Sequence, residues 1–538
     1  MAKVMQVNAE EEGYAWDDVN MKMFDLRDVR IGRSEEVEYM KSRNIWREVD
    51  VDESWAKTGR GPVSVRWVDT DKGTEGVPNI RCRLVARDFK SRDDRDREDL
   101  FAATPPLELL KCLLSKAVSG SKCRKILVID VKKAHLNPEC DQDVYIELPP
   151  EANPGPGKCG KLVHWLYGFR PAAQAWENHY SSNLEKAGFY KGDASPVLFW
   201  HAELDISCVV HGDDFTFVSE AEGLDYIEGL MKKWYEVKVK ARLGPEPGDD
   251  KEVDILGRRV RWTENGVEYE ADPRHRRIIL EQLGLEEGSK GLTTNGKADT
   301  EELEEEELPG EEATSFRALA ARVNYLAQDC PDIQFPAKEV CREMSKPTPA
   351  SWRKLKALAR FLLRRGAVVL KFGWQPDGLP ILVFTDSDWA GCRRTRKSTS
   401  GGAIMIGGHC IRTWSTTQAP IALSSAEAEY YAMVEGAVKA KGLESMLKEL
   451  GMFQDEPLTL LSDSSAARAF ASRRGLGRMR HMETRMLWLQ AEVQQQRIQL
   501  DKVLGKENPA DLMTKYLSEN EIREHLRRLS LFWDRPES

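Results

Sequence analysis

Two adjacent aspartates, Asp213 and Asp214, interrupt the β-forming run VVHGDDFTFVS at residues 209–219. Strand interiors are poor in aspartate, so the pair indicates either a hairpin turn or a site where carboxylates hold a ligand. Two carboxylates forced side by side repel and raise each other's pKa unless a cation neutralises them. An oxygen-loving divalent ion such as Mg²⁺ is the natural partner. Two such ions about 3.5–4 Å apart stabilise the attacking and leaving oxygens in phosphoryl transfer.

Asp130 is a further candidate acid, about 80 residues before the pair, and it ends the apolar run KILVID. An aspartate at the end of a strand is well placed to present a carboxylate to a ligand. The same residue type also caps helices, because its side chain accepts hydrogen bonds from free backbone N–H groups. Taken alone, Asp130 favours the capping role.

A second group of acids lies after residue 380. Asp386 ends the strand-like run ILVFTD, and Asp463 ends LTLLSD in the same way. Glu427 and Glu429 lie in SSAEAEYYAMVEGA, on the first turns of a long helix, where acids also suit the helix dipole. Asp511 lies in NPADLMTK, which predicts the first turn of a terminal helix. These carboxylates can meet only if a sheet brings the strand ends together.

The elements that must position these acids follow from the hydrophobic pattern. Residues 63–254 alternate short β-like runs with helical stretches, and the acidic block at 298–313 predicts a solvated linker rather than an interaction tail. Residues 314–366 have amphipathic helical periodicity throughout. The remaining pattern predicts a strand (381–386), a hairpin (402–414), a long helix (425–450), a strand (457–462), two helices (464–472 and 481–494), a strand (496–504) and a final helix.

The composition indicates the class of protein but does not indicate a function. The 538 residues are 41% hydrophobic and carry a formal charge of −9. A negative net charge is not typical of nucleic-acid-binding proteins, although local basic patches matter more for such binding than the net charge does. The ten cysteines and nine histidines show no zinc-ligand spacing. No secretory signal and no membrane-length apolar run occurs, so we expect an intracellular protein of the cytoplasm, the nucleus or both, with no membrane partner.

Several long motifs resemble one known family in order and spacing. They are IRCRLVARDFK, LVIDVKKAHLNPECDQDVYIELP, KLVHWLYGFRPAAQAW, VVHGDDFTF and ARVNYLAQDCPDIQF. They are similar to the reverse transcriptase–ribonuclease H region of the Pol proteins of copia-type LTR retrotransposons, and the resemblance covers roughly residues 60–518. In that family the first Asp and the paired Asp bind catalytic Mg²⁺, a role that the resemblance gives to Asp130, Asp213 and Asp214. The pair then lies on a hairpin turn and also holds metal.

Other residues take family roles by the same resemblance. Arg83, with Arg81 as second choice, would bind the incoming triphosphate bidentately. His135 stands where the family has an aromatic that excludes the ribose 2′-OH, and Gly168 would allow close approach of the nucleotide. His211 and Gly212 depart from the family, which usually has a tyrosine and a small apolar residue before the paired Asp and contacts the primer–template there.

The resemblance implies a ribonuclease H domain in which Asp386, Glu429, Asp463 and Asp511 are the metal ligands. Glu429 is preferred to Glu427 because EYYA matches the family pattern, and Asp388 is interpreted as a surface or capping acid rather than a ligand. The histidine-bearing loop of many cellular ribonucleases H has no counterpart before Asp511. A locally basic segment at 472–485 is expected to contact nucleic-acid phosphates through Arg473, Arg474, Arg478 and Arg480.

The implied fold is a multidomain α+β and α/β protein, a right-hand polymerase followed by a ribonuclease H-like mixed sheet. The expected division is a polar, partly ordered lead-in (1–60), fingers and palm (61–280), an acidic linker with a helical thumb or connection (281–380), a ribonuclease H-like domain (381–518) and a C-terminal tail (519–538).

The implied function is RNA-directed DNA polymerase with ribonuclease H activity, using two Mg²⁺ ions in each site, with Mn²⁺ as the alternative ion. Expected partners are an RNA template, a DNA primer, an RNA–DNA hybrid and dNTPs, and other Pol or Gag products of the same element are further candidates. Two alternatives stay open: a decayed or repurposed copy that binds nucleic acid without polymerising, and a copy that retains only hybrid-specific ribonuclease activity.

Overall fold

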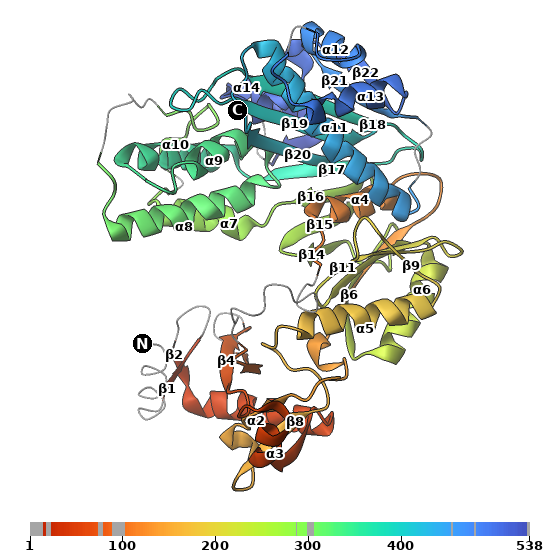
Figure 1. The fold of residues 1–538 in the computed structure, drawn as a ribbon, viewed down its shortest axis with the longest axis vertical. Coiled ribbons are helices and arrows are strands. Elements are labelled where there is room, and N and C mark those ends of the chain that lie inside the picture. The colour runs from red at the N-terminus through yellow and green to blue at the C-terminus, as the bar shows by residue number, and fades with distance from the viewer. Residues whose placement is uncertain are drawn as a thin grey trace.

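A computed structural model describes residues 14–17, 23–73, 79–88, 103–286, 288–298, 306–452, 456–477 and 480–534. In Figure 1 the chain curves like a letter C, from an N-terminal unit at the bottom, through a sheet at the right, to the C-terminal part at the top. Helices and sheets alternate along the chain, so the protein is of mixed α and β structure. Within the described residues, no helix combines the length and apolar character that crossing a bilayer requires.

The N-terminal unit is built from short strands around one long helix. A β4–β5 hairpin and a three-stranded sheet of order β3–β8–β7 pack against α2. Its elements are β1 (Tyr14–Trp16), β2 (Met23–Asp25), α2 (Leu26–Ser42), β3 (Trp46–Asp50), α3 (Val51–Thr58), β4 (Val65–Asp71), β5 (Ile80–Ala86), η2 (Ala134–Leu136), β7 (Tyr145–Ile146), η3 (Pro150–Ala152) and β8 (Lys158–Leu162).

The polar lead-in predicted at residues 1–60 needs correction over residues 23–58, because these form helices and strands of this unit. Asp25 caps α2 by accepting a hydrogen bond from the Arg27 N–H at 2.8 Å. Val29, Val37 and Met40 of α2 are buried in the same core as strand residues far along the chain. The apolar face of α2 is narrow and its other positions are mostly charged. The sequence of this segment therefore does not indicate that the helix packs into a core.

A six-stranded antiparallel sheet of order β13–β6–β12–β11–β10–β9 follows. One face packs against α5 and α6 through residues such as Trp176 and Ile227, and the other packs against α4 through Leu109 and Leu113. The elements are α4 (Leu107–Ala117), β6 (Lys125–Val131), α5 (Ala172–Lys186), β9 (Tyr190–Lys191), β10 (Leu198–His201), β11 (Ile206–His211), β12 (Asp214–Ser219), α6 (Ala221–Trp234) and β13 (Val237–Leu243). Because both faces are covered, the central strands are mostly apolar, with Asp130 and Asp214 near their ends.

A second sheet, of order β14–β15–β16–β17–β23, joins distant parts of the chain. It runs across the boundaries predicted at residues 280 and 518. Its strands and surrounding helices are β14 (Glu252–Ile255), β15 (Arg258–Thr263), β16 (Gly266–Glu270), α7 (Pro273–Gln282), α8 (Gly310–Ala327), η4 (Pro331–Ile333), α9 (Gln334–Cys341), α10 (Pro349–Arg365), β17 (Val368–Gly373), α14 (Glu519–Arg528) and β23 (Leu531–Trp533).

The C-terminal tail predicted at 519–538 is therefore wrong over residues 519–533. Helix α14 begins with a capping box in which Ser518 and Glu521 exchange hydrogen bonds. Strand β23 pairs antiparallel with β17, with Leu531 opposite Leu370. Leu526, Leu531 and Trp533 are buried, so hydrophobic burial holds this segment against the second sheet.

The last sheet is mixed, with order β20–β19–β18–β21–β22. Strand β18 pairs antiparallel with β19 and parallel with β21, which places the ends of β18 and β21 at the same edge. The elements are β18 (Ile381–Asp388), β19 (Thr399–Ile406), β20 (His409–Thr417), α11 (Ser425–Glu449), β21 (Leu458–Ser462), α12 (Ser465–Ser472), η5 (Thr484–Leu487), α13 (Trp488–Gln494), β22 (Ile498–Lys502), η6 (Gly505–Glu507) and η7 (Pro509–Met513).

The strand, hairpin and helix predictions from residue 381 to 472 and the strand at 496–504 are confirmed to within a few residues. The helix predicted at 481–494 starts later, as the 3₁₀ turn η5 followed by α13. Asp511 lies in the 3₁₀ helix η7 rather than in the first turn of an α-helix. Pro509 starts this turn, and Thr514 ends it before a full α-helical turn can repeat.

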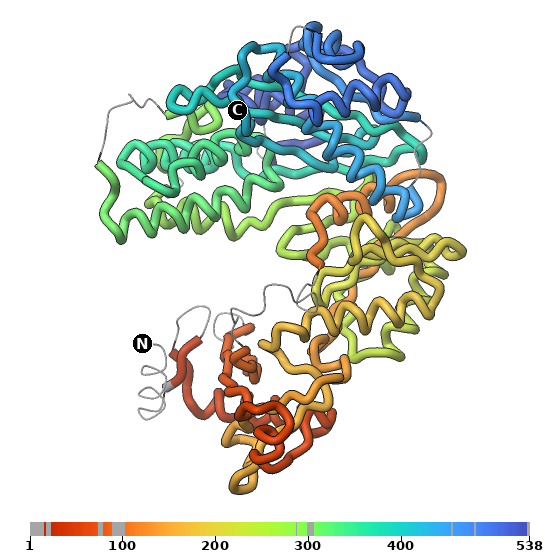
Figure 2. Tube along the Cα trace, viewed as in Figure 1, coloured from red at the N-terminus to blue at the C-terminus, as the bar shows by residue number. Residues whose placement is uncertain are grey.

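The six-stranded and mixed sheets meet through the C-terminal end of α11. The Leu450 carbonyl accepts hydrogen bonds from the Lys116 ammonium at 2.8 Å and the Ser207 hydroxyl at 2.9 Å. His409 of β20 accepts a hydrogen bond from Ser115 of α4 at 2.9 Å. In Figure 2 the orange trace that includes α4 lies beside the C-terminal half of the chain. Buried residues of both parts belong to one continuous core.

Candidate active sites

Three predicted acids gather at one end of the six-stranded sheet. Asp130 near the end of β6 lies directly opposite Asp214 at the start of β12. Asp213 occupies a two-residue turn with Gly212, between the paired residues His211 and Asp214. Gly212 adopts a φ of +65°, a left-handed conformation that suits glycine in a tight hairpin. The predicted hairpin is thus confirmed, and the turn holds the acid pair beside Asp130.

A lysine partly neutralises this cluster. The Lys240 ammonium of β13 lies 3.5 Å from Asp130 Oδ2 and forms a close ion pair with Asp214 Oδ1. Burial raises the pKa of Asp214 above its usual value, although Lys240 opposes the shift. Lys240 was not among the predicted site residues. The alternation in VKVKARL at 237–243 was the available signal, because it puts Lys238 and Lys240 on one face of a strand.

A chain of three side chains leads from the N-terminal unit towards these acids. The Arg83 guanidinium lies 5.6 Å from the ring centroid of Tyr167, and the Tyr167 and His135 rings are also 5.6 Å apart. Burial lowers the pKa of His135, and the negative charge of Asp213 opposes this shift. Arg83 Nε is buried and has no hydrogen-bond partner among the described residues. Arg81, two positions earlier, is exposed.

Gly168 packs closely against strand β5. It adopts a φ of +88°, and a Cβ there would lie 2.3 Å from the Ala86 carbonyl oxygen and 2.5 Å from Val85. The adjacent Tyr167 carbonyl accepts a hydrogen bond from the Ala86 N–H at 2.7 Å. Glycine is thus required for the close approach of β5. The predicted close approach of a nucleotide stays a prediction.

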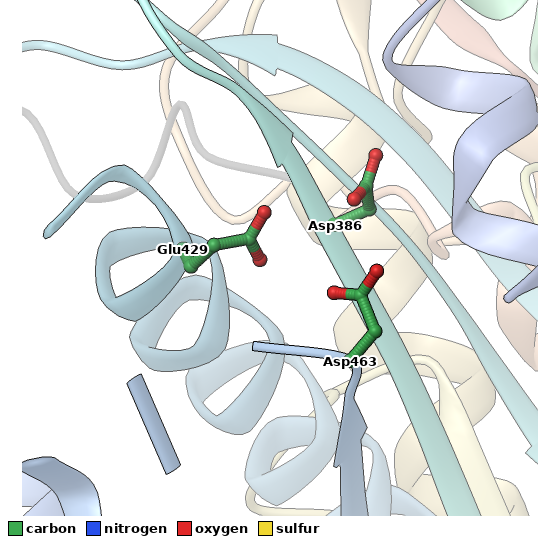
Figure 3. A group of neighbouring side chains, drawn as sticks. All are labelled: Asp386, Glu429 and Asp463. Carbon is green, nitrogen blue, oxygen red and sulfur yellow. The ribbon is translucent and has the colours of Figure 1, made fainter. Parts of the chain in front are cut away.

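The second group of acids comes together at the edge of the mixed sheet. Oxygen atoms of Asp386, Glu429 and Asp463 all lie within 4.8 Å of one another. Figure 3 shows the three carboxylates turned towards a common point, from strand β18, helix α11 and the loop after β21. The Ser387 N–H donates to Glu429 Oε1 at 3.2 Å, whereas Glu429 Oε2 is buried without a partner among the described residues.

The charges in this acid triad are poorly compensated. Burial raises the pKa of Asp386, and the carboxylates of Asp511 and Asp463 raise it further. Burial raises the pKa of Glu429 as well, with added repulsion from Asp386 and Asp463. Three neighbouring carboxylates, one with an orphaned buried oxygen, offer the kind of oxygen donors that a hard divalent cation binds. The residues present therefore fit a metal ion.

Asp511 lies at the side of the triad. Its Oδ1 forms an ion pair with the Lys515 ammonium at 2.9 Å, and the same ammonium lies 3.8 Å from Asp386 Oδ2. The fourth predicted acid is thus linked to the triad through Lys515, which was not predicted. Asp388, predicted to be a surface or capping acid, accepts a hydrogen bond from the N–H of Thr399, its partner in the neighbouring strand β19, which is a bond between strands rather than a helix cap.

Glu427 faces different partners from Glu429. One of its oxygens accepts hydrogen bonds from the Leu423 N–H and binds His481 Nε2, both at 3.0 Å. The other accepts a hydrogen bond from the Tyr431 hydroxyl at 2.9 Å. Glu427 therefore ties the segments before and beyond α11 to the helix. His481 itself belongs to the basic segment at 472–485.

The remaining predicted residues are His211 and the arginines of the basic segment. His211 lines a cavity of about 430 Å³ together with Asp214, Arg258 and Tyr325. In the basic segment, the Arg473 guanidinium lies 4.5 Å from the ring centroid of Phe470, and Arg474 and Arg480 are exposed. Arg478 lies outside the described residues.

Comparison with known proteins identifies relatives of this chain. Residues 44–243 match the family model described as reverse transcriptase (RNA-dependent DNA polymerase). The chain is 26% identical over 510 residues to the Retrovirus-related Pol polyprotein from transposon TNT 1-94 of Nicotiana tabacum, covering 91% of this chain and 36% of that protein. It is 26% identical over 470 residues to that from transposon RE1 of Arabidopsis thaliana, covering 85% and 31%. The chain thus spans about a third of the length of these relatives.

Solved structures give weaker matches. The foamy viral protease-reverse transcriptase in complex with double-stranded DNA matches 89% of this chain and 70% of that chain, at 13% identity and a TM-score of 0.25. A truncated apo telomerase from Candida tropicalis matches 46% and 62%, at 11% identity and a TM-score of 0.27. Scores at this level do not establish a shared arrangement.

Proposed function

Given that the chain belongs to the reverse transcriptase region of copia-type retrotransposon Pol proteins, we propose that it is an RNA-directed DNA polymerase that extends a DNA primer with dNTPs on an RNA template. The observation that carries this proposal is the register of Asp130 opposite Asp214, with Asp213 on the turn between β11 and β12. Action in the cytoplasm or nucleus, and contact with other Pol or Gag products of the element, are part of the same proposal.

Asp130, Asp213 and Asp214 would hold Mg²⁺, or Mn²⁺ in its place, because carboxylate oxygens are the ligands these ions prefer. Such ions supply charge stabilisation to the attacking and leaving oxygens of a phosphoryl transfer. Lys240 keeps the acids close together by screening their repulsion. Arg83 binds triphosphate oxygens, and the paired His135 and Tyr167 rings form the wall beside the sugar.

We also propose a ribonuclease H activity at Asp386, Glu429, Asp463 and Asp511. The order β20–β19–β18–β21–β22, with its antiparallel hairpin and its parallel strand pairs, supports a ribonuclease H-like fold. Mg²⁺ held there would activate water for cleavage of the RNA strand of a hybrid. Lys515 orients Asp511 beside Asp386, and the Ser387 N–H fixes one oxygen of Glu429.

Two assays on the full chain test these proposals. Primer extension on an RNA template with Mg²⁺ should give product, and a labelled RNA–DNA hybrid should lose its RNA strand. Absence of extension by folded protein that still binds primer–template would favour the alternative of a decayed copy. Cleavage without extension would favour the ribonuclease-only alternative.

A further inference from the structure

The segment at residues 508–515, which includes η7, is tied to the mixed sheet at both ends. At its start, the Asn508 side-chain amide donates a hydrogen bond to the Thr385 carbonyl of β18 at 2.9 Å, and Asn508 is fully buried. Near its end, the Met513 carbonyl accepts a hydrogen bond from the Ser415 hydroxyl of β20 at 2.6 Å. Breaking a buried hydrogen bond leaves a polar group unpaired, which is costly. The segment therefore has a fixed position beside the end of β18.

A glycine lets this segment approach the strand opposite Asp386. Gly401 of β19 pairs directly with Asp386 of β18. A Cβ on Gly401 would lie 2.6 Å from Thr514 Cγ2 and 2.9 Å from Met513 Cβ, which is closer than carbon atoms pack. Thr514 is 1% exposed. The Thr514 side chain therefore rests on the backbone position next to Asp386, and a larger residue at position 401 would push it away.

The Thr514 hydroxyl has one proton to donate, and it donates to Asp386 Oδ2. The Asp511 carbonyl oxygen is a competing acceptor, 3.3 Å from the same hydroxyl. That carbonyl already accepts hydrogen bonds from the backbone N–H groups of Thr514 at 3.2 Å and Lys515 at 3.3 Å. A carboxylate is also a stronger acceptor than a carbonyl. The hydroxyl proton is therefore committed to Asp386.

The Lys515 ammonium acts on the same oxygen of Asp386. It lies 3.8 Å from Asp386 Oδ2 and 2.9 Å from Asp511 Oδ1. A hydroxyl and a cation of one segment thus engage Oδ2, whereas Oδ1 accepts no hydrogen bond from any residue that the structure describes. The two oxygens of Asp386 are therefore not equivalent, and Oδ1 is the one left for a ligand.

The residues that follow this segment fasten it to α9 and η4. The Tyr516 ring centroid lies 5.0 Å from that of Phe335 of α9. The Leu517 N–H donates to Asn295 Oδ1 at 2.9 Å, and the Asn295 side-chain amide donates in turn to a carbonyl of η4 at 3.2 Å. The Thr514 hydroxyl is thus held from the mixed sheet on one side and from the helical region on the other.

A hydrogen bond of this kind matters for a metal ligand because a free carboxylate turns easily. The last side-chain torsion of aspartate has a broad energy profile, so an unrestrained side chain presents either oxygen. Hydrogen bonds to a metal-binding carboxylate fix its orientation, and their removal typically weakens metal affinity by about 10- to 100-fold.

We propose that Thr514 is a positioning residue of the ribonuclease site, whose hydroxyl holds Oδ2 of Asp386 so that Oδ1 faces the divalent cation shared with Glu429 and Asp463. Thr514 itself does not touch the cation. Gly401 serves the same purpose indirectly, since it leaves room for Thr514. The inference rests on the metal-dependent cleavage proposed above, and it adds the group that orients the ligand on the central strand.

Mn²⁺ binding by the full chain tests this assignment, with the ion alone as the probe and the electron paramagnetic resonance signal of free Mn²⁺ as the readout. An Asp130→Asn, Asp214→Asn background removes two acids of the first cluster, so that the remaining binding reports on the triad. Thr514→Val keeps the shape of the side chain but removes the hydroxyl, and it should weaken Mn²⁺ binding by about tenfold. Thr514→Ser restores the hydroxyl and should bind Mn²⁺ as the background protein does.

Cleavage of a labelled RNA–DNA hybrid gives a second measurement on the same proteins. The Mn²⁺ concentration for half-maximal cleavage should rise by about tenfold in Thr514→Val, because the ligand is presented less often in its binding orientation. At saturating Mn²⁺ the rate should return towards that of the background protein. Thr514→Ser should need no additional Mn²⁺.

The matched control is Thr416→Val, which removes another threonine hydroxyl that is bound to a carboxylate. The Thr416 hydroxyl of β20 lies 2.7 and 2.9 Å from the two oxygens of Glu435. This variant should keep the Mn²⁺ affinity of the background protein. Thermal unfolding checks that each variant is folded, and Thr514→Ala takes the place of Thr514→Val if valine prevents folding.

Three results would count against these assignments in different ways. Background affinity in folded Thr514→Val would overturn the positioning role and leave the proposed ribonuclease site intact. Equal losses in Thr514→Val and Thr514→Ser would also overturn it, because packing of the methyl group would then be the cause. If Asp463→Asn removes no Mn²⁺ binding from the background protein, the triad holds no metal and the proposed ribonuclease site itself fails.

Discussion

Asp130, Asp213 and Asp214 come from neighbouring antiparallel strands and one tight turn, and Lys240 lies between two of them. Asp386, Glu429 and Asp463 come instead from a strand, a helix and the loop after a parallel strand, and one Glu429 oxygen has no partner among the described residues. The first cluster is set by local register and is partly neutralised by the protein. The second depends on long-range packing and is less well compensated, because Lys515 pairs closely with Asp511 and lies 3.8 Å from Asp386 Oδ2. The second site should therefore respond more strongly to an added divalent ion.

The largest expected effect is the separation of the two activities. Asp214→Asn should reduce extension on the order of 1000-fold and leave hybrid cleavage intact, because metal-held charge stabilisation is worth several kcal/mol. Asp463→Asn should have the reverse effect. Parallel extension and cleavage assays on both variants check this. Loss of both activities in either folded variant would show that the sites act as one unit.

The next effect concerns the junction between the two regions. Burial lowers the pKa of His409 to about 4. Its Nε2 donates to the Gly373 carbonyl at 2.7 Å, and its Nδ1 accepts from Ser115 and Gln375, both at 2.9 Å. The unfolded chain binds a proton near pH 6.5 and the folded chain only near 4, so the free energy of unfolding falls as pH drops through this window. The expected loss from His409 is about 3 kcal/mol.

Denaturant unfolding at pH 7 and pH 4 measures this loss, with His409→Gln as the reference because glutamine stays neutral. The variant should be less stable than the parent at pH 7 and should lose less stability on acidification. An identical pH dependence in the two proteins would show that protonation of His409 does not weaken the junction.

A smaller effect is expected from removing the built-in cation. Lys240→Met should destabilise the protein by about 1 kcal/mol without Mg²⁺, since the pair is partly exposed and solvent screens it. Added Mg²⁺ should raise the melting temperature of the variant more than that of the parent, because Asp130 and Asp214 then lack their cation. Thermal unfolding over a Mg²⁺ titration measures both quantities. Equal Mg²⁺ responses would mean that Lys240 does not compensate these acids.

The smallest effect tests how local the first cluster is. Gly212→Ala should cost about 1 kcal/mol, because alanine resists a φ of +65° although its Cβ would meet no atom within 4 Å. Gly212→Asn should cost less, since asparagine tolerates this conformation. Extension should fall slightly in the alanine variant while hybrid cleavage stays unchanged. A loss of cleavage in this variant would contradict the independence of the two clusters.

Local patterns predicted much of this molecule. The hairpin around Asp213 and the strands that lead to Asp386 and Asp463 follow from short apolar runs that end in aspartate. Sequence patterns did not predict the roles of Lys240 and Lys515 or the packing of Gly168 against Ala86. These features arise from contacts between segments that are distant in sequence, which a local pattern does not encode. The N-terminal helix α2 was missed because its buried face is narrow and surrounded by charge. Strand β23 was missed because it is short and its partner β17 lies far upstream.

The pairing of β23 with β17 also has a consequence for synthesis on the ribosome. The sheet that begins at β14 lacks its last strand until residues 531–533 have left the ribosome, and until then β17 exposes an unpaired edge. Trp533, whose ring centroid lies 5.7 Å from that of Phe361, covers part of α10 only at that stage. Nascent chains therefore carry an aggregation-prone edge from the synthesis of β17 until that of β23, and a chain that ended between the two would keep it open.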